Sequence, residues 1–167
     1  MSTTRAPISV EQYLRTSYRP DCDYVDGEVV ERNLGEWDHG RLQGLLIRLL
    51  MNRYESEGIF VIPELRVQVK PTRFRVPDIC VTLGLPGEQI LTKPPFLCIE
   101  ILSPEDRMQR VQNRIDDYIE MGVPYVWVLD PQTKGAYAAT AVDGLHEVKI
   151  LRTENPVLEL ALDEIFA

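Results

Sequence analysis

Phe96-Leu97-Cys98-Ile99-Glu100-Ile101 is an apolar run that contains one acid, and Val76-Pro77-Asp78-Ile79-Cys80-Val81 repeats this pattern earlier in the chain. Short runs rich in β-branched residues are typical of buried β-strands. A carboxylate in such a strand must be hydrogen-bonded, neutralised or bound to a cation, because burying a bare charge costs more free energy than a domain has to spare. Two such acids in neighbouring strands suggest a divalent metal site. For each acid alone, a turn cap or an arginine partner is the alternative.

The length and composition are those of a globular protein. The chain has 167 residues, of which 44% are hydrophobic and 26% are charged, and this predicts one domain over residues 1–167 with a core at roughly 24–166. No stretch has the length and apolar purity of a membrane span or signal peptide, so we expect a cytoplasmic protein. Cys22, Cys80 and Cys98 are odd in number and form no Cys-x-x-Cys pair, which indicates structural thiols.

The net charge of −8 argues against broad electrostatic attraction to nucleic acid. Such attraction comes from Lys and Arg side chains that neutralise phosphates. A cluster of arginines can still make a local site on an acidic protein. Any contact with DNA is therefore expected to be local.

Before the two acids, the pattern predicts two helices, a hairpin and two strands. The predicted elements are a helix over residues 9–18, a hairpin over 24–30, a helix over 38–58 and strands at 60–62 and 65–69. Ser9 and Asp38 can cap the two helices, and Gly58 can end the longer one. Asp26-Gly27 suits the type I′ turn of a hairpin.

After the two acids, the pattern predicts a helix, a strand, a hairpin and a short terminal element. The predicted elements are a helix over residues 103–122, a strand at 125–129, a hairpin of 135–140 with 146–151 and a terminal element at 158–166. The helix has an apolar stripe formed by Met108, Val111, Ile115 and Ile119. Because strand, helix and strand form a crossover unit, the strands of Glu100 and Trp127 should run parallel. The sequence therefore predicts an α/β fold with a mixed sheet flanked by helices.

Several motifs in this order resemble one known family. They are Asp26-Gly27-Glu28, His39, Pro77-Asp78, Pro94-Pro95, Glu100-Ile101-Leu102-Ser103-Pro104, Tyr118, Gly122-Val123, Trp127 and Asp130. Together they are similar to the Uma-type family of putative restriction endonucleases, which belongs to the PD-(D/E)xK nuclease-like superfamily. The resemblance spans roughly residues 24–166. It implies a restriction endonuclease-like fold and the hydrolysis of phosphodiester bonds in DNA.

The resemblance also implies a metal site. Asp78, Glu100 and the main-chain carbonyl of Ile101 match the positions that hold Mg²⁺ or Mn²⁺ in this superfamily, and oxygen ligands suit such hard ions. An acid from the long first helix often completes these sites, and Glu36 or Asp38 is nearest to that place. Either acid can equally be a helix cap. His39 is more typical of a supporting donor than of a ligand.

The chain departs from the superfamily pattern at its lysine. That lysine would fall at Leu102, and the similar family carries one at the position of Arg114. Arginine can stabilise a phosphate in the transition state, but it stays protonated and cannot act as a general base. With Arg107 and Arg110, Arg114 shares one helix face that either follows a phosphate backbone or pairs with Asp106 and Asp117 in solvent.

Two further readings of the function stay open beside the nuclease. The first is a non-catalytic nucleic-acid-binding or regulatory module that retains the fold, which the missing lysine and the acidic charge favour. The second is a subunit that acts through self-association, and we expect a homodimer.

Overall fold

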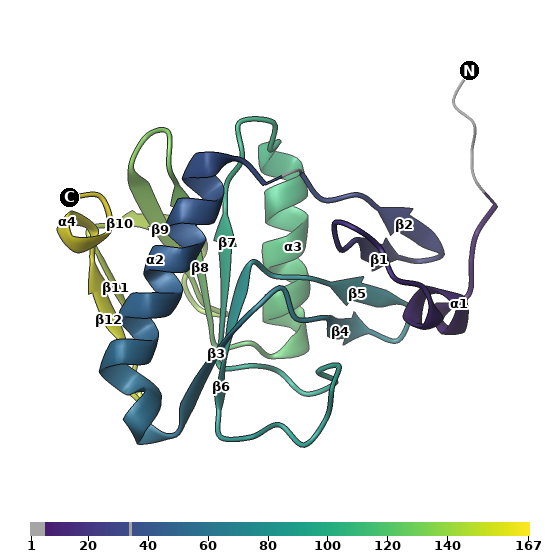
Figure 1. The fold of residues 1–167 in the computed structure, drawn as a ribbon, viewed down its shortest axis with the longest axis horizontal. Helices are drawn as coiled ribbons and strands as arrows, with labels where there is room; N and C mark the ends of the chain where they lie inside the picture. The colour runs from purple at the N-terminus through teal and green to yellow at the C-terminus, as the bar shows by residue number, and fades with distance from the viewer. Residues whose placement is uncertain (1–5, 34) are drawn as a thin grey trace.

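Two helices cover opposite faces of a mixed β-sheet in the computed structural model of this protein, which describes residues 6–33 and 35–167 (Figure 1). Within these residues the sheet has the strand order β10-β9-β8-β7-β6-β3. Its strands are β3 (Ile59–Pro63), β6 (Ile79–Leu83), β7 (Leu97–Ile101), β8 (Tyr125–Asp130), β9 (Gly135–Ala139) and β10 (His146–Val148). Strands β7 and β8 run parallel, and the other neighbouring strands run antiparallel. The predicted α/β fold with a mixed sheet flanked by helices is confirmed.

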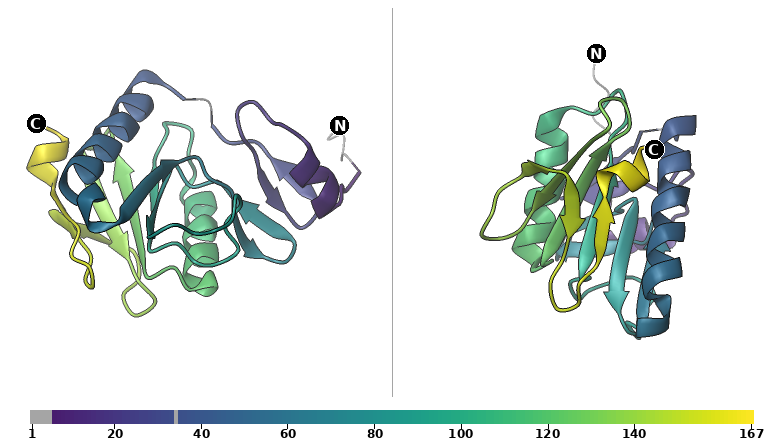
Figure 2. Two further views of the ribbon diagram at one scale, coloured as in Figure 1. Left: turned by 60° about the horizontal axis from the view of Figure 1, so that its bottom comes forward. Right: turned by 90° about the vertical axis from the view of Figure 1, so that its left-hand side faces the viewer.

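Strand β7 lies in the layer of the sheet between α2 and α3 (Figure 2). Its odd-numbered residues pack in the core cluster of α2 (Trp37–Tyr54), and Cys98 packs in the cluster of α3 (Met108–Met121). The buried residues of α2 are Leu42, Leu46 and Leu50, and the buried apolar ones of α3 are Val111, Ile115 and Tyr118. Because side chains alternate along a strand, Glu100 lies on the same face as Cys98, toward α3.

A smaller sheet lies beside α3 and carries the N-terminal part of the chain (Figure 1). In the described residues its order is β2-β1-β5-β4. The strands are β1 (Asp23–Val25), β2 (Glu28–Val30), β4 (Val67–Lys70) and β5 (Arg73–Arg75). Helix α1 (Val10–Arg15) packs on this sheet, where Tyr13 stacks on Tyr24 with 5.0 Å between ring centroids. The predicted hairpin at residues 24–30 is therefore confirmed, and its first strand also pairs with β5.

The C-terminal elements pack in the same core cluster as α2. Strands β11 (Ile150–Arg152) and β12 (Glu159–Ala161) form an antiparallel pair, and α4 (Leu162–Ile165) follows directly. Arg53 of α2 forms an ion pair with Glu164 of α4. Helix α2 passes into a short 3₁₀ turn, η1 (Glu55–Glu57), and Gly58 then adopts the left-handed conformation with φ 77°. The glycine stop predicted for this helix is confirmed.

Three local predictions are wrong. Helix α3 begins at Met108 and not at Ser103, because residues 103–106 form a turn in which the Ser103 amide donates to the Asp106 carboxylate at 2.8 Å. Met108 is 62% exposed and does not belong to the buried stripe. The N-cap of α2 is Glu36, which makes no side-chain cap bond, and Asp38 lies inside the first turn.

The cysteines and the composition of the helices are two further features of the described residues. Cys22, Cys80 and Cys98 are buried and free, as structural thiols are. Within residues 6–33 and 35–167, no helix combines the length and the apolar composition needed to cross a lipid bilayer.

A buried ionic cluster fixes the small sheet to α3. Asp117 of α3 accepts hydrogen bonds from Arg75 Nε at 2.7 Å and from Arg73 Nη1 at 2.8 Å, both on β5. Arg75 also reaches Asp23 of β1, at 3.1 Å. The side chains of Asp23, Arg75 and Asp117 are at most 9% exposed. Since α3 also carries Arg114 and Tyr118, this cluster sets where these two side chains lie.

Replacing Asp117 should therefore destabilise the fold. In Asp117→Asn, Arg75 loses one of its two buried carboxylate partners and keeps only Asp23, and breaking one partner of a buried pair costs about 3 kcal/mol in free energy of unfolding. Urea unfolding monitored by circular dichroism measures the change. Asp116→Asn is the matched control, because Asp116 is the exposed neighbour and bonds only to Gln112. Equal unfolding midpoints for the two variants would contradict the role given to the cluster.

Candidate active site

Asp78 and Glu100 lie opposite each other where β6 and β7 meet. The antiparallel register pairs Ile79 with Ile99 and Cys80 with Cys98. Continuing it by one residue brings Asp78 opposite Glu100, and side chains at opposed positions share a face with their Cβ atoms about 5 Å apart. Both residues are buried, with exposed fractions of 3% and 2%. The structure thus brings together the two acids singled out in the sequence.

The Asp78 carboxylate is held by three donors. Its Oδ1 accepts from Arg32 Nη2 at 2.6 Å and lies 3.2 Å from His39 Nε2. Its Oδ2 accepts from the Ile101 amide at 2.7 Å. The Asp78 main-chain carbonyl accepts from Gln43 Nε2 at 2.8 Å, which ties this segment to α2. Every carboxylate oxygen of Asp78 therefore has a partner.

These partners decide the charge of Asp78. Burial works to raise the pKa of Asp78, but the hydrogen bond from His39, the charge of Arg32 and the Ile101 amide outweigh it and bring the pKa below its ordinary value. In return, the hydrogen bond to Asp78 raises the pKa of His39 against the effect of burial. Asp78 is therefore a carboxylate at neutral pH.

Arg32 is a site residue that sequence reasoning missed. It lies just after β2, and its partner Asp78 is 46 residues further along the chain. Neither helical nor strand periodicity links two such positions. The available signal was that a buried acid requires a cation, without any indication of which arginine supplies it.

Glu100 has weaker support. Its Oε1 accepts from Tyr118 OH at 2.5 Å, and its Oε2 lies 3.6 Å from Arg114 Nε. Burial raises the pKa of Glu100 to about 7, and the charge of Asp78 adds to this, while Arg114 and Tyr118 act in the opposite direction. Of the two opposed acids, Glu100 is therefore the one with a raised pKa.

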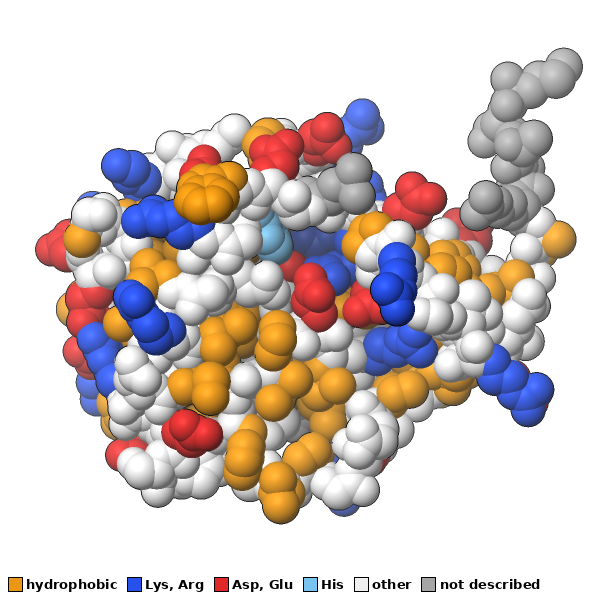
Figure 3. Space-filling view, in the orientation of Figure 1, with side chains coloured by type: hydrophobic (Ala, Val, Ile, Leu, Met, Phe, Trp, Pro, Cys, Tyr) orange, Lys and Arg blue, Asp and Glu red, His pale blue; other side chains and the backbone are white. Residues whose placement is uncertain are grey.

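A small hollow opens over the two acids. Its volume is about 20 Å³, close to that of one water-sized group, and it is lined by Arg32, Asn33, His39, Asp78, Glu100, Ile101, Ser103, Asp106 and Arg114. Arg114 Nε is buried and has no hydrogen-bond partner among the described residues, since its nearest carboxylate oxygen is Glu100 Oε2 at 3.6 Å. Figure 3 shows a histidine between acidic and basic side chains on this face of the molecule. The hollow is therefore lined by both acids and by Arg114, whose Nε is buried beside it.

The donor set fits a hard divalent ion with few protein ligands. Among the residues that the structure describes, no three His, Cys, Asp or Glu side chains lie close enough to hold a metal ion together. Mg²⁺ is typically bound by one or two carboxylates, with water and substrate phosphate completing its shell. Asp78 and Glu100 supply two carboxylates, and Ile101 lines the hollow beside them. The number and type of oxygen ligands at the hollow are therefore compatible with such an ion.

The other candidate residues lie outside the hollow. Asp38 and Arg41 line a separate cavity between α2 and the C-terminal residues. Glu36 lines neither the hollow nor this cavity. Arg107 is the N-cap residue of α3. Arg110 lines a groove of about 180 Å³ beside the site, which also contains Arg32 and Arg114, and it donates to the Glu31 carbonyl at 3.2 Å. Of the three arginines on α3, Arg114 lies in the site and Arg110 beside it.

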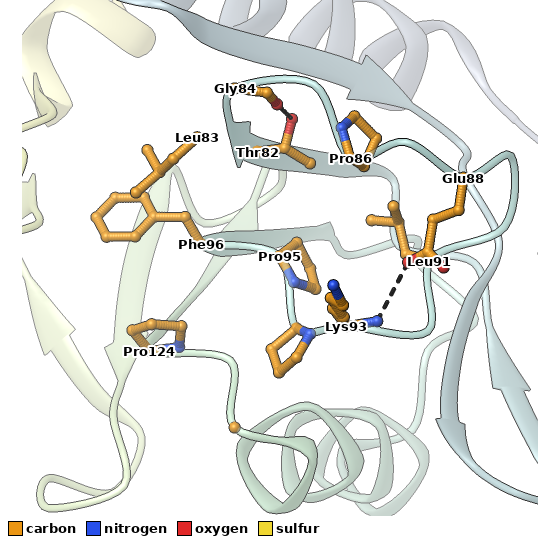
Figure 4. Close-up of a pocket in the computed structure, with 12 residues that line it drawn as sticks. Thr82, Leu83, Gly84, Pro86, Glu88, Leu91, Lys93, Pro95, Phe96 and Pro124 are labelled. Carbon is orange, nitrogen blue, oxygen red and sulfur yellow. Dashed lines mark hydrogen bonds between the residues drawn. The ribbon is translucent and has the colours of Figure 1, made fainter.

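A larger cavity of about 310 Å³ lies at the opposite end of β7 (Figure 4). Its walls are mainly apolar, with Leu83, Pro95, Phe96 and Pro124 among them. The carboxylate that lines it, Glu88, is occupied by the amide and hydroxyl of Thr92 at 2.7 Å each. The cavity therefore lacks the paired acids of the hollow, and we place the chemistry at Asp78 and Glu100.

The burial of Glu100 should appear in the pH dependence of stability. Its pKa rises from an ordinary 4.5 to about 7 on folding, so between these values the unfolded chain loses this proton first and stability falls as pH rises. Glu100→Gln lacks this pH-dependent loss. Between pH 4 and pH 8 its free energy of unfolding should therefore rise relative to that of the wild type by on the order of 3 kcal/mol. Urea unfolding in EDTA measures it. Glu57→Gln, on exposed η1, should show no such gain. Wild-type and Glu100→Gln curves that stay parallel with pH would contradict the prediction.

Comparison with one known structure supports the fold. A putative nuclease belonging to DUF820 from Anabaena variabilis has a TM-score of 0.82 to this chain, with 19% sequence identity over 96% of this chain and 98% of that one. A DrdV–DNA complex solved by cryo-electron microscopy has a TM-score of 0.44, with 15% identity over 72% of this chain and 10% of that one. No curated protein matches the sequence.

The family comparison covers most of the chain. Residues 10–166 match the family described as Uma2, putative restriction endonuclease. The match includes both opposed acids, Arg114 and the partners of Asp78. The protein belongs to the Uma2 family of putative restriction endonucleases.

Proposed function

We propose that this protein hydrolyses phosphodiester bonds of DNA, with Mg²⁺ or Mn²⁺ held by Asp78, Glu100 and the main-chain carbonyl of Ile101. The observation that carries the proposal is the pair of opposed, buried carboxylates beside the unused N–H of Arg114. Membership of a nuclease family supports the choice of substrate. A divalent ion bound there would neutralise charge on the phosphate and lower the pKa of a water molecule.

The side chains of this protein have separable tasks in such a reaction. Asp78 is oriented by Arg32, His39 and the Ile101 amide, which together fix the direction of its carboxylate. Tyr118 orients Glu100 by its hydroxyl group. Arg114 would donate to a phosphate oxygen beside the hollow after its side chain moves, because its buried Nε has no hydrogen-bond acceptor among the described residues. Arg114 stays protonated and so stabilises charge without accepting a proton.

DNA contacts on this face are local. Figure 3 shows blue side chains interspersed with red ones rather than a broad basic surface, in keeping with the net charge of −8. The groove beside the hollow contains Arg32, Arg110 and Arg114. We propose that Arg110 and the exposed Arg107 contact phosphates next to the one at Arg114, so that affinity falls with salt according to these few contacts.

Removing one carboxylate should abolish both ion binding and cleavage. In Glu100→Ala the ion keeps too few protein oxygens, so calorimetry should detect no Mn²⁺ binding and supercoiled, linear and single-stranded DNA should stay intact. The same preparation serves as the control for contaminating nucleases. Equal cleavage by the wild type and Glu100→Ala would defeat the nuclease proposal.

Arg114 should act on the rate more than on the ion. Arg114→Ala removes the donor to the phosphate and should reduce Mn²⁺-dependent cleavage by roughly a hundredfold, as is typical for a transition-state donor. Arg114→Lys should retain cleavage, because the family carries lysine at this position. The measurement is the initial rate of plasmid nicking at saturating Mn²⁺. Full activity of Arg114→Ala would show that this residue is structural.

A nucleic-acid-binding or regulatory module without catalysis is the second candidate. It is favoured by Leu102 in place of the superfamily lysine and by arginines that already neutralise both acids. Trp37 offers a way to detect binding without cleavage, since it is 81% exposed and two residues from His39, whereas Trp127 is fully buried. Quenching of tryptophan fluorescence by DNA, without cleavage in either ion, would favour the module.

A cytoplasmic homodimer stays a prediction. Leu83 and Leu85 are 50% and 82% exposed next to the cavity of Figure 4, and they are candidate contacts between subunits. Light scattering at several protein concentrations tests the oligomeric state.

A further inference from the structure

We infer that Arg32 is a built-in counter-ion that occupies Asp78 in place of the divalent cation, and that it must leave Asp78 Oδ1 before the cation binds. This inference rests on the proposed function and adds a step that neither the fold nor the family specifies. It makes Arg32 a positioning residue that controls the affinity of the site for the ion.

The first argument is the use of the Asp78 oxygens. Oδ1 already has Arg32 Nη2 at 2.6 Å and His39 Nε2 at 3.2 Å, and a carboxylate oxygen has two lone pairs. Oδ2 accepts one hydrogen bond, from the Ile101 amide at 2.7 Å, so a cation bound at its second lone pair would still share the carboxylate with the Arg32 guanidinium. A cation that binds Oδ1 must displace one of its two partners. Arg32 is the charged partner at the shorter distance.

The second argument is charge. A guanidinium at 2.6 Å and a divalent ion at about 2.1 Å from the same oxygen would be like charges in contact, at a site whose side chains are 14% and 4% exposed. With Arg32 on Asp78 and Arg114 beside Glu100, two cations already balance two carboxylates. Adding the ion without moving Arg32 would leave the buried site strongly positive, which is costly.

The third argument is that Arg32 has a second acceptor within reach. Glu64 Oε1 lies 3.7 Å from Arg32 Nη1, and the Glu64 side chain is 49% exposed. The Glu64 amide also donates to the Asp78 carbonyl at 3.2 Å, so Glu64 is fixed next to Asp78. Arg32 can therefore exchange Asp78 for Glu64 without losing a carboxylate partner. Arg114 differs, because its closest carboxylate oxygen is 3.6 Å away and its Nε has no acceptor.

The experiment compares Mn²⁺ affinity by calorimetry in four proteins. Arg32→Gln should bind Mn²⁺ about tenfold or more tightly than the wild type, because the competing cation is gone. Glu64→Gln should bind it more weakly, because Arg32 loses its second acceptor. Arg53→Gln is the matched control for net charge, since Arg53 lies 14 residues along α2 from His39, about 21 Å away, and pairs with Glu164; its affinity should not change.

A second measurement excludes a purely structural role for Arg32. Without metal, Arg32→Gln should unfold at a lower temperature than the wild type, and added Mn²⁺ should raise its midpoint by more than it raises that of the wild type. The double variant with Glu64→Gln should match Arg32→Gln, because Glu64 acts only through Arg32. If Arg32→Gln does not fold, the Mn²⁺ affinity of Glu64→Gln still tests the role of Arg32. Arg32→Lys should keep the Mn²⁺ affinity of the wild type.

The outcomes separate this inference from the proposed function. Equal or weaker Mn²⁺ binding by Arg32→Gln, or unchanged binding by Glu64→Gln, overturns the role of Arg32 while the nuclease proposal stands. Absence of binding in all four proteins at millimolar Mn²⁺ overturns both. Tighter binding by Arg32→Gln with an unchanged Arg53→Gln control supports the inference.

Discussion

The opposition of Asp78 and Glu100 at the end of β6 and β7 is the constraint on which the rest of the site depends. Two buried carboxylates at facing positions repel each other, so each must be offset by donors or cations. These come from three parts of the fold: Arg32 from the segment after β2, His39 from α2 and Arg114 from α3. The small sheet and both helices therefore meet at one point, and the ionic cluster around Asp117 keeps α3 there.

The two acids have similar burial but opposite electrostatic outcomes. Asp78 has three donors within 3.2 Å and its pKa is lowered, whereas Glu100 has one short hydrogen bond and its pKa rises to about 7. Donor number rather than exposure thus sets the difference. Asp78 has a fixed charge and a fixed position. Glu100 is the acid whose protonation changes near neutral pH.

Sequence patterns predicted what depends on short spacing and missed what depends on distant contacts. The parallel pair of β7 and β8, the stop at Gly122 and the opposed acids follow from periodicity and order. The start of α3 was misplaced because Asp106 bonds to the Ser103 amide in a turn that propensity does not reveal. Arg32 and the pairing of β1 with β5 join segments more than 40 residues apart, and periodicity carries no information on such contacts.

The arginines around the acids offset charge that a metal ion would otherwise have to offset. A site made of carboxylates alone would need the ion for stability, since its charges would otherwise stay uncompensated. Here Arg32 and Arg114 supply that compensation from within the chain. With this compensation the same scaffold suits a nuclease that binds its ion only when Arg32 yields, and equally a module that never binds one. The property that separates these two functions is the affinity of the hollow for a cation, not the fold around it.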